Sequence, residues 1–133
     1  MTTILGSCVA VCLYDPVKKI GGINHFMLPF WNGEGLASAK YGNIAMDKLI
    51  EDLTRKGCKT SNMIAKLFGG ANQSNFTMKI GERNVDIARK VLKQHNIKLV
   101  AESVNGTIGR KLIFDTSTGE VRMKFVNSDK RIK

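Results

Sequence analysis

Residues 2–16 read TTILGSCVAVCLYDP, and residues 17–25 continue directly with VKKIGGINH. The run over residues 9–14 is apolar and rich in β-branched and aromatic types, which predicts a buried strand. Asp15-Pro16 predicts a turn, because proline fixes φ and an aspartate side chain accepts backbone hydrogen bonds. Residues 19–25 then read as a returning strand, so the segment predicts an antiparallel β-hairpin.

The register of this hairpin decides whether a cysteine and a histidine meet. With a four-residue loop over residues 15–18, counting back along both strands places Cys8 opposite His25. Directly opposed residues in an antiparallel pair have Cβ atoms about 4.5–5.5 Å apart, close enough for an imidazole to reach a thiol. A slip of one residue would send the two side chains to opposite faces. Gly21-Gly22 could hold a bulge that causes such a slip.

A facing Cys8–His25 pair predicts nucleophilic chemistry. A free thiol titrates near pH 8.5, and an adjacent imidazolium lowers that value. The thiolate is a strong nucleophile, and the protonated imidazole can donate to a leaving amine. A third group usually orients the imidazole; since Asp15 lies at the far end of the hairpin, the hydroxyl of Thr2 or Thr3, or a backbone carbonyl, would have to serve. The alternative is that the cysteine is a small buried hydrophobe and the histidine a structural residue.

Length and composition indicate an ordinary globular chain. The 133 residues predict one domain over 1–133, with residues 127–133 as a disordered basic tail. No apolar run reaches transmembrane length and no signal peptide opens the chain, so we expect no membrane insertion. An odd set of three cysteines gives no disulfide framework, which favours reduced thiols in the cytoplasm. The cysteine and histidine spacings match no zinc motif, so we expect no metal and no cofactor, with Cys12 and Cys58 as bystanders.

The formal net charge of +10 is unusual for a domain of this size and predicts attraction to an acidic surface. Basic residues are spread along the chain and cluster only at Lys130, Arg131 and Lys133. Individually they indicate a solvated face; collectively they would steer docking onto an acidic receptor or another acidic partner. Nucleic-acid binding is an alternative that only the charge suggests. Aromatic residues are sparsely interleaved and no recognition motif is present, so we do not expect it.

The rest of the chain alternates helix and strand. Hydrophobic periodicity predicts helices over 36–56 and 82–95 and strands over 60–68, 97–102, 111–115 and 120–125. Together with the hairpin this predicts an α/β layered domain, with a mixed, largely antiparallel sheet packed against two helices. The loop over 30–35 would line the rim of the site. The glycine loop over 69–72 either brings backbone N–H groups to a substrate as an oxyanion hole or forms a simple sharp turn. His95, at a helix end, is given no catalytic role.

The pattern Thr2-x-x-Leu-Gly-Ser-Cys8-Val-Ala-Val-Cys, followed by Asp-Pro, Gly-Gly and His25-x-Met-Leu-Pro, resembles the bacterial CheD family of chemoreceptor glutamine deamidases. The resemblance extends from Thr2 to about Phe125. Further matching pieces are Tyr41-Gly42 with Ala45-Met46, Phe68-Gly-Gly-Ala71, Ile80-Gly-Glu-Arg-Asn-Val85, Gly109-Arg-Lys111 and Thr118-Gly-Glu-Val121.

The resemblance implies Cys8, His25 and Thr2 as catalytic residues, in a fold similar to the catalytic domain of a deamidating bacterial toxin. It implies thioester chemistry that converts chemoreceptor glutamines to glutamates in the cytoplasm during chemotaxis adaptation, and some relatives also hydrolyse receptor methyl esters. It further implies a CheC-type chemotaxis phosphatase as a partner. The alternative function is a binding module that docks the phosphatase or the receptor, with catalysis minor or lost. Thr2 lies almost at the start of this chain, and chain ends fray unless they are tied down, so its order depends on contacts with other segments.

Overall fold

The computed structural model describes residues 1–31, 33, 36–72 and 79–126. The predicted basic tail and parts of the predicted rim loop lie outside these residues. The elements in chain order are β1 (Thr2–Leu5), β2 (Val9–Asp15), β3 (Ile20–Ile23), α1 (Gly42–Arg55), the short 3-10 helix Thr60–Asn62, β4 (Ile64–Gly69), α2 (Ile80–Gln94), β5 (Lys98–Val104), β6 (Arg110–Phe114) and β7 (Val121–Phe125).

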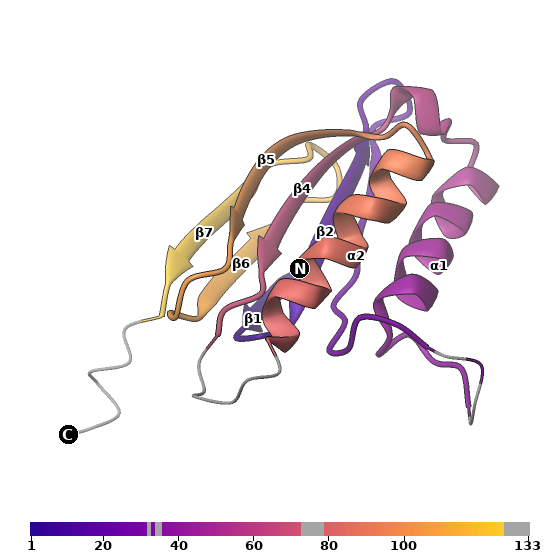
Figure 1. Ribbon diagram of the computed structural model, residues 1–133. Helices are drawn as coiled ribbons and strands as arrows, with labels where there is room; N and C mark the ends of the chain where they lie inside the picture. Colours follow the sequence, from indigo (N-terminus) through magenta and orange to yellow (C-terminus); the bar gives the residue numbers. More distant parts are fainter. Residues whose placement is uncertain (32, 34–35, 73–78, 127–133) are drawn as a thin grey trace.

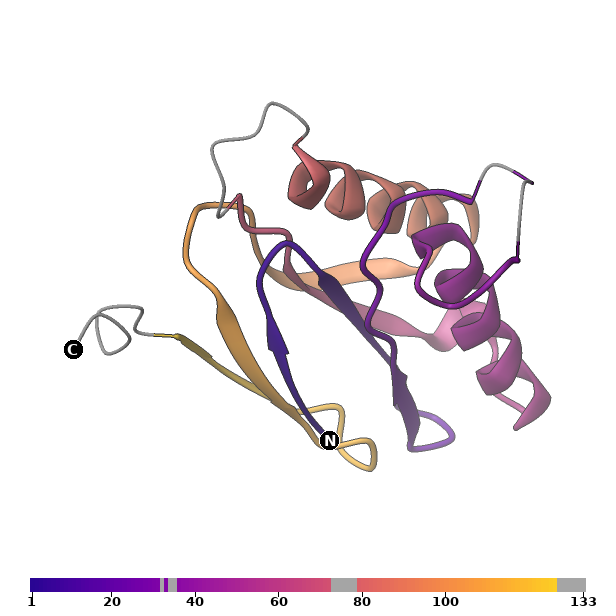
Figure 2. The same cartoon turned by 90° about the horizontal axis from the view of Figure 1, so that it is seen from below.

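The strands form two sheets. One has three antiparallel strands in the order β1-β6-β7, and the other has four strands in the order β3-β2-β4-β5, in which β4 and β5 are parallel. The helices α1 and α2 cover one face of the four-stranded sheet, and the three-stranded sheet covers the other (Figures 1 and 2). The expected α/β layered class is confirmed. The strands divide into two sheets rather than forming one.

The strand β2 is covered on both of its faces. Every residue of this strand is buried, and residues 9–14 form a continuous apolar run without alternation. Val9, Val11 and Leu13 belong to the core beneath the helices, whereas Ala10 and Cys12 belong to the core between the two sheets. Since fully burying one such aliphatic side chain contributes about 1.5–3 kcal/mol, both faces add to stability. Cys8 has the parity of Ala10 and therefore faces the three-stranded sheet.

The turn between β2 and β3 lies one residue later than predicted. Asp15 still pairs with Ile20, so the loop is residues 16–19. The Asp15 carboxylate holds the turn by accepting the backbone N–H groups of Val17 at 2.9 Å and Lys18 at 3.1 Å. The predicted pairing of Cys8 directly opposite His25 is therefore wrong by two residues. Because side chains alternate with a period of two, this shift keeps both on the predicted face.

Several boundaries differ from the predicted ones because tertiary contacts override local periodicity. The helix α1 begins at Gly42 and not at residue 36, since Tyr41 forms an isolated parallel bridge with Leu28. A Cβ at Gly42 would lie 2.7 Å from the Phe26 ring, so glycine lets the helix start close to the sheet.

No helix of the described residues is long and apolar enough to cross a membrane.

The strand β1, which the sequence did not predict, ties down the beginning of the chain. It pairs antiparallel with β6 over all four of its residues. The amino group of Met1 donates to the carbonyl of Phe114 at 2.9 Å, and the Phe114 N–H donates back to Met1 at 2.8 Å. Thr2 and Thr3 are therefore held in extended backbone.

Candidate active site

Cys8 immediately precedes β2, and His25 follows β3 by two residues. The residue after each of them, Val9 and Phe26, forms a pair that exchanges two backbone hydrogen bonds of 3.0 and 2.9 Å. The side chains of Val9 and Phe26 are fully buried on the helix side. Because neighbours along a strand point to opposite faces, Cys8 and His25 both point away from the helices. Since Val9 lies opposite Phe26, the next pair is Ala10 opposite His25. Cys8 and His25 are therefore diagonal neighbours on adjacent strands. Such neighbours lie roughly 7–8 Å apart, and less at Cβ.

Thr3 is the threonine that contacts His25. Its Oγ1 lies 2.8 Å from Nδ1 of His25. Thr2, the residue predicted for this contact, points the other way: it is exposed and pairs with the half-exposed Ile113, whereas Thr3 pairs with the fully buried Leu112. Of the two threonines, Thr3 is therefore the one whose hydroxyl contacts the imidazole. Since Nδ1 is engaged, Nε2 is the nitrogen that remains for the thiol.

The site is partly exposed, and partial burial favours the neutral forms of the Cys8 thiol and the His25 imidazole. Burial raises the pKa of the Cys8 thiol, although its own backbone N–H acts in the opposite direction. Burial also lowers the pKa of His25. Both shifts run opposite to those of the predicted thiolate–imidazolium pair, because partial loss of contact with water disfavours the charged form of each group. The geometry instead suits the histidine to act as a general base.

The loop after β4 is a sharp turn that clamps the segment before Cys8. Gly70 N–H donates to the Cys8 carbonyl at 2.9 Å, and Ala71 N–H donates to the Gly6 carbonyl at 3.0 Å. Gly69 adopts a φ of +108°, and a Cβ there would lie 2.2 Å from the Cys8 carbonyl oxygen. The oxyanion-hole alternative fails for Gly70 and Ala71, because their N–H groups are already donated within the protein.

The other two cysteines are buried. Cys12 is 2% exposed and burial raises the pKa of its thiol to about 12, while Cys58 is 4% exposed. Cys8 is therefore the accessible thiol of the three. In the part of the chain that the structure describes, no group of three or more His, Cys, Asp or Glu side chains is arranged to hold a metal ion.

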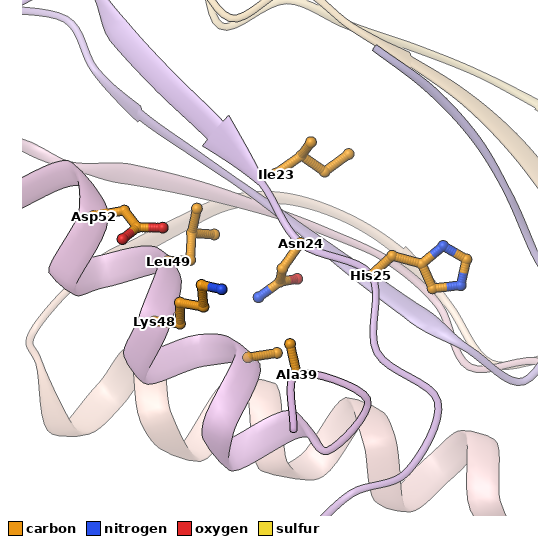
Figure 3. Close-up of a pocket in the computed structure, with 8 residues that line it drawn as sticks. Ile23, Asn24, His25, Ala39, Lys48, Leu49 and Asp52 are labelled. Atoms are coloured by element: carbon orange, nitrogen blue, oxygen red, sulfur yellow. The ribbon is translucent and has the colours of Figure 1, made fainter. Parts of the chain in front are cut away.

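A cavity of about 210 Å³ lies between the end of β3 and α1. Figure 3 shows Lys48, Leu49 and Asp52 reaching it from the helix, and Asn24 from the strand side. His25 also lines this cavity, but its ring points away from the other labelled side chains in Figure 3. Thr3, the partner of the imidazole Nδ1, is not among the residues that line this cavity.

Asn84 is a site-proximal residue to which sequence reasoning gave no role. It lies on α2, is 0% exposed, and its Nδ2 donates to the carbonyls of Ser7 at 2.9 Å and Met27 at 3.0 Å. It therefore contacts both chain segments that carry the reactive residues. The available signal was its position, since a polar residue here interrupts the buried helix stripe Gly81, Val85, Ala88, Val91 and Leu92.

Comparison with known proteins identifies the family. A family model described as CheD chemotactic sensory transduction matches residues 27–125. The chain belongs to the CheD family. A protein named "Probable chemoreceptor glutamine deamidase CheD" from Sulfurimonas denitrificans is 52% identical over 128 residues, which cover 93% of this chain and 82% of that protein. The protein of the same name from Trichlorobacter lovleyi is 51% identical over 124 residues, covering 91% and 77%.

More distant CheD relatives match nearly the whole chain. A Ruegeria protein named "Probable chemoreceptor glutamine deamidase CheD 1" is 40% identical over 131 residues, which cover 98% of this chain and 70% of the relative. The family model begins after both Cys8 and His25, whereas this match leaves almost no part of the chain uncovered. The assignment of this chain to the CheD family thus draws on its full length.

Proposed function

We propose that this CheD-family chain is a chemoreceptor glutamine deamidase that uses Cys8 as its nucleophile. The observation that carries the proposal is the arrangement of a partly exposed thiol and an imidazole on one sheet face, with Thr3 Oγ1 2.8 Å from the imidazole Nδ1. The names of the relatives supply the substrate class, a glutamine side chain of a chemoreceptor.

The first half-reaction forms a thioester and releases ammonia. His25 Nε2 takes the proton from the Cys8 thiol as its sulfur bonds to the substrate carboxamide carbon. For this, Nδ1 must carry the other proton and donate it to Thr3 Oγ1, and the contact holds the ring so that Nε2 is turned toward the thiol. The imidazolium then returns its proton to the nitrogen as the C–N bond breaks. The backbone N–H of Cys8, which already lies by its own sulfur, is placed to stabilise negative charge at this centre.

The second half-reaction restores the enzyme. His25 takes a proton from a water molecule, and the water oxygen bonds to the thioester carbon. The C–S bond breaks, the Cys8 sulfur recovers a proton, and the product is a glutamate side chain. The net change is glutamine plus water to glutamate plus ammonia. The same thioester would allow hydrolysis of a glutamyl methyl ester, with methanol as the leaving group.

The outer face of the three-stranded sheet carries basic side chains that suit an acidic docking partner. Lys111 and Lys124 stand directly opposite one another on β6 and β7, although like charges at that spacing repel. With Arg122 and the half-exposed Ile113 they line a cavity of about 230 Å³. We assign this face to the initial encounter with an acidic receptor surface. A CheC-type phosphatase is the second partner that we propose for this chain.

The competing function is a docking module without catalysis. It predicts that Cys8→Ser keeps receptor binding and signalling while receptor glutamines are never converted, even by the wild-type protein. The test is mass analysis of a receptor fragment incubated with wild type, Cys8→Ala and the matched control Cys12→Ala. Conversion that Cys8→Ala abolishes and Cys12→Ala retains supports the deamidase; no conversion by folded wild-type protein excludes it.

A further inference from the structure

One buried side-chain amide lies between the two segments that carry the reactive residues. Asn84 projects from α2, and each of its two carbonyl acceptors belongs to one segment: Ser7 precedes the nucleophile, and Met27 follows the histidine by two residues. A planar NH₂ group has two hydrogens, so both are engaged. The donor distances of 2.9 and 3.0 Å are those of ordinary hydrogen bonds.

The nucleophile segment is clamped at three consecutive carbonyls. Gly6 and Cys8 accept backbone N–H groups from the loop after β4, and the carbonyl between them, that of Ser7, accepts from Asn84. Only the central contact uses a side chain. It is therefore the one that a substitution can remove while the backbone contacts on either side remain.

Holding the Ser7 carbonyl also orients the Cys8 N–H. The two groups belong to one peptide plane, the bond is trans, and in a trans peptide they point in opposite directions. With the carbonyl drawn toward α2, the N–H is directed away from that helix, to the side where the thiol lies. Rotation of this peptide would carry the N–H away from the sulfur and from any charge that develops on the bound carboxamide.

The remaining oxygen of the amide indicates why an asparagine is present. Asn84 Oδ1 is buried and has no hydrogen-bond partner within the described residues. A buried polar atom without a partner is destabilising, and an apolar side chain of similar size would avoid it. The helix stripe around it is otherwise apolar or glycine, so packing alone would favour leucine here. The benefit of the residue lies in its two donors.

We infer that Asn84 is a positioning residue of the CheD site, which fixes the Ser7–Cys8 peptide and the segment after His25 relative to one another. This inference builds on the proposed deamidase function. Both hydrogen bonds of Asn84 go to backbone carbonyls, so its effect on the thiol would be exerted through the Ser7–Cys8 peptide.

The test compares Asn84→Leu with Val91→Ala, which weakens the same helix on the same buried face far from the site. We expect Asn84→Leu to lower kcat for receptor deamidation about 100-fold with KM changed less than threefold, as for loss of an oriented backbone donor. We also expect a shift to higher pH in the midpoint of Cys8 alkylation by iodoacetamide, which is measured by peptide mass analysis. The reason is that the Cys8 N–H no longer lowers the thiol pKa. Val91→Ala should leave both quantities unchanged at a comparable melting temperature.

A folded Asn84→Leu protein with wild-type kcat and a wild-type alkylation profile would overturn the inference, as would equal losses in Val91→Ala. Alkylation needs no receptor, so a wild-type protein that fails to deamidate would refute the proposed function while still leaving the positioning role testable. If Asn84→Leu does not fold, hydrogen exchange in the wild type decides. Both side-chain amide protons of Asn84 should exchange at least about 100-fold more slowly than those of Asn43, which is partly exposed. Equal rates would contradict the two contacts.

Discussion

Replacing Thr3 by valine is the sharpest test of the geometry around His25. Valine has nearly the shape of threonine but lacks the hydroxyl, so the substitution removes the 2.8 Å contact with Nδ1 and preserves the strand. The matched control is Thr2→Val, one residue earlier on the same strand, where the side chain points to the exposed face.

The structure sets the size of the effect. A hydrogen bond between neutral groups contributes about 0.5–1.5 kcal/mol net, which corresponds to roughly 2- to 13-fold in a rate. Because the bond orients the imidazole and does not bind the substrate, the loss should fall on kcat and not on KM. We therefore expect kcat to fall about 2- to 13-fold in Thr3→Val and less than twofold in Thr2→Val.

The assay is steady-state release of ammonia from a receptor fragment, with circular dichroism as the check on folding. The family resemblance assigned this role to Thr2, so the pair of variants separates the two threonines. A large loss in Thr2→Val with no loss in Thr3→Val would refute the contact seen in the structure and restore the original assignment.

Three further predictions concern pH, salt and stability. Burial lowers the pKa of His25 from 6.5, and its basic form exists above that pKa, so the acid limb of kcat/KM should have its midpoint below 6.5; a midpoint above 6.5 in a pH–rate profile would contradict the neutral resting pair. Charge reversal by Lys111→Glu with Lys124→Glu should lower kcat/KM and flatten its decrease with added salt, because long-range attraction to an acidic partner is screened; surface plasmon resonance with a receptor fragment should show the change in the association rate, and an unchanged salt slope would remove this face from the encounter. Burial alone would raise the pKa of Asp15, but the backbone N–H groups of Lys18, Lys59 and Val17 lower it below its ordinary 3.8. The carboxylate therefore stabilises the fold above pH 3.8 and loses this effect as pH falls through its lower folded value. Asp15→Ala should reduce the free energy of unfolding, measured by urea denaturation at pH 6, by about 2–4 kcal/mol. A difference that persists undiminished at pH 2 would contradict the stabilising role of the ionised carboxylate.

The hairpin shows what the sequence could establish. The apolar run over 9–14 and the Asp15-Pro16 signal predicted two strands and the face shared by Cys8 and His25. The register was wrong by two because Asp15 stays in the strand and closes the turn with its side chain, which propensity alone does not reveal. The shared face survived, because only an odd slip exchanges the faces of a strand.

The contacts between distant segments could not be derived from local patterns. Thr3 approaches His25 because β1 pairs with β6, a partner more than a hundred residues away in the chain. Asn84 interrupts an apolar stripe, yet nothing in that stripe says which carbonyls its amide reaches. Helix starts behave similarly, since α1 begins only where Gly42 can approach Phe26.

The central claim is that the sulfur of Cys8 forms a thioester with a glutamine side chain. Rapid acid quenching of wild-type protein with a receptor fragment, followed by mass analysis of the peptide that contains Cys8, tests it most directly. The account predicts a covalent adduct on Cys8 that is absent in Cys8→Ala and accumulates in His25→Ala only slowly, because the base is missing. Glutamine-to-glutamate conversion at an undiminished rate in Cys8→Ala would contradict it.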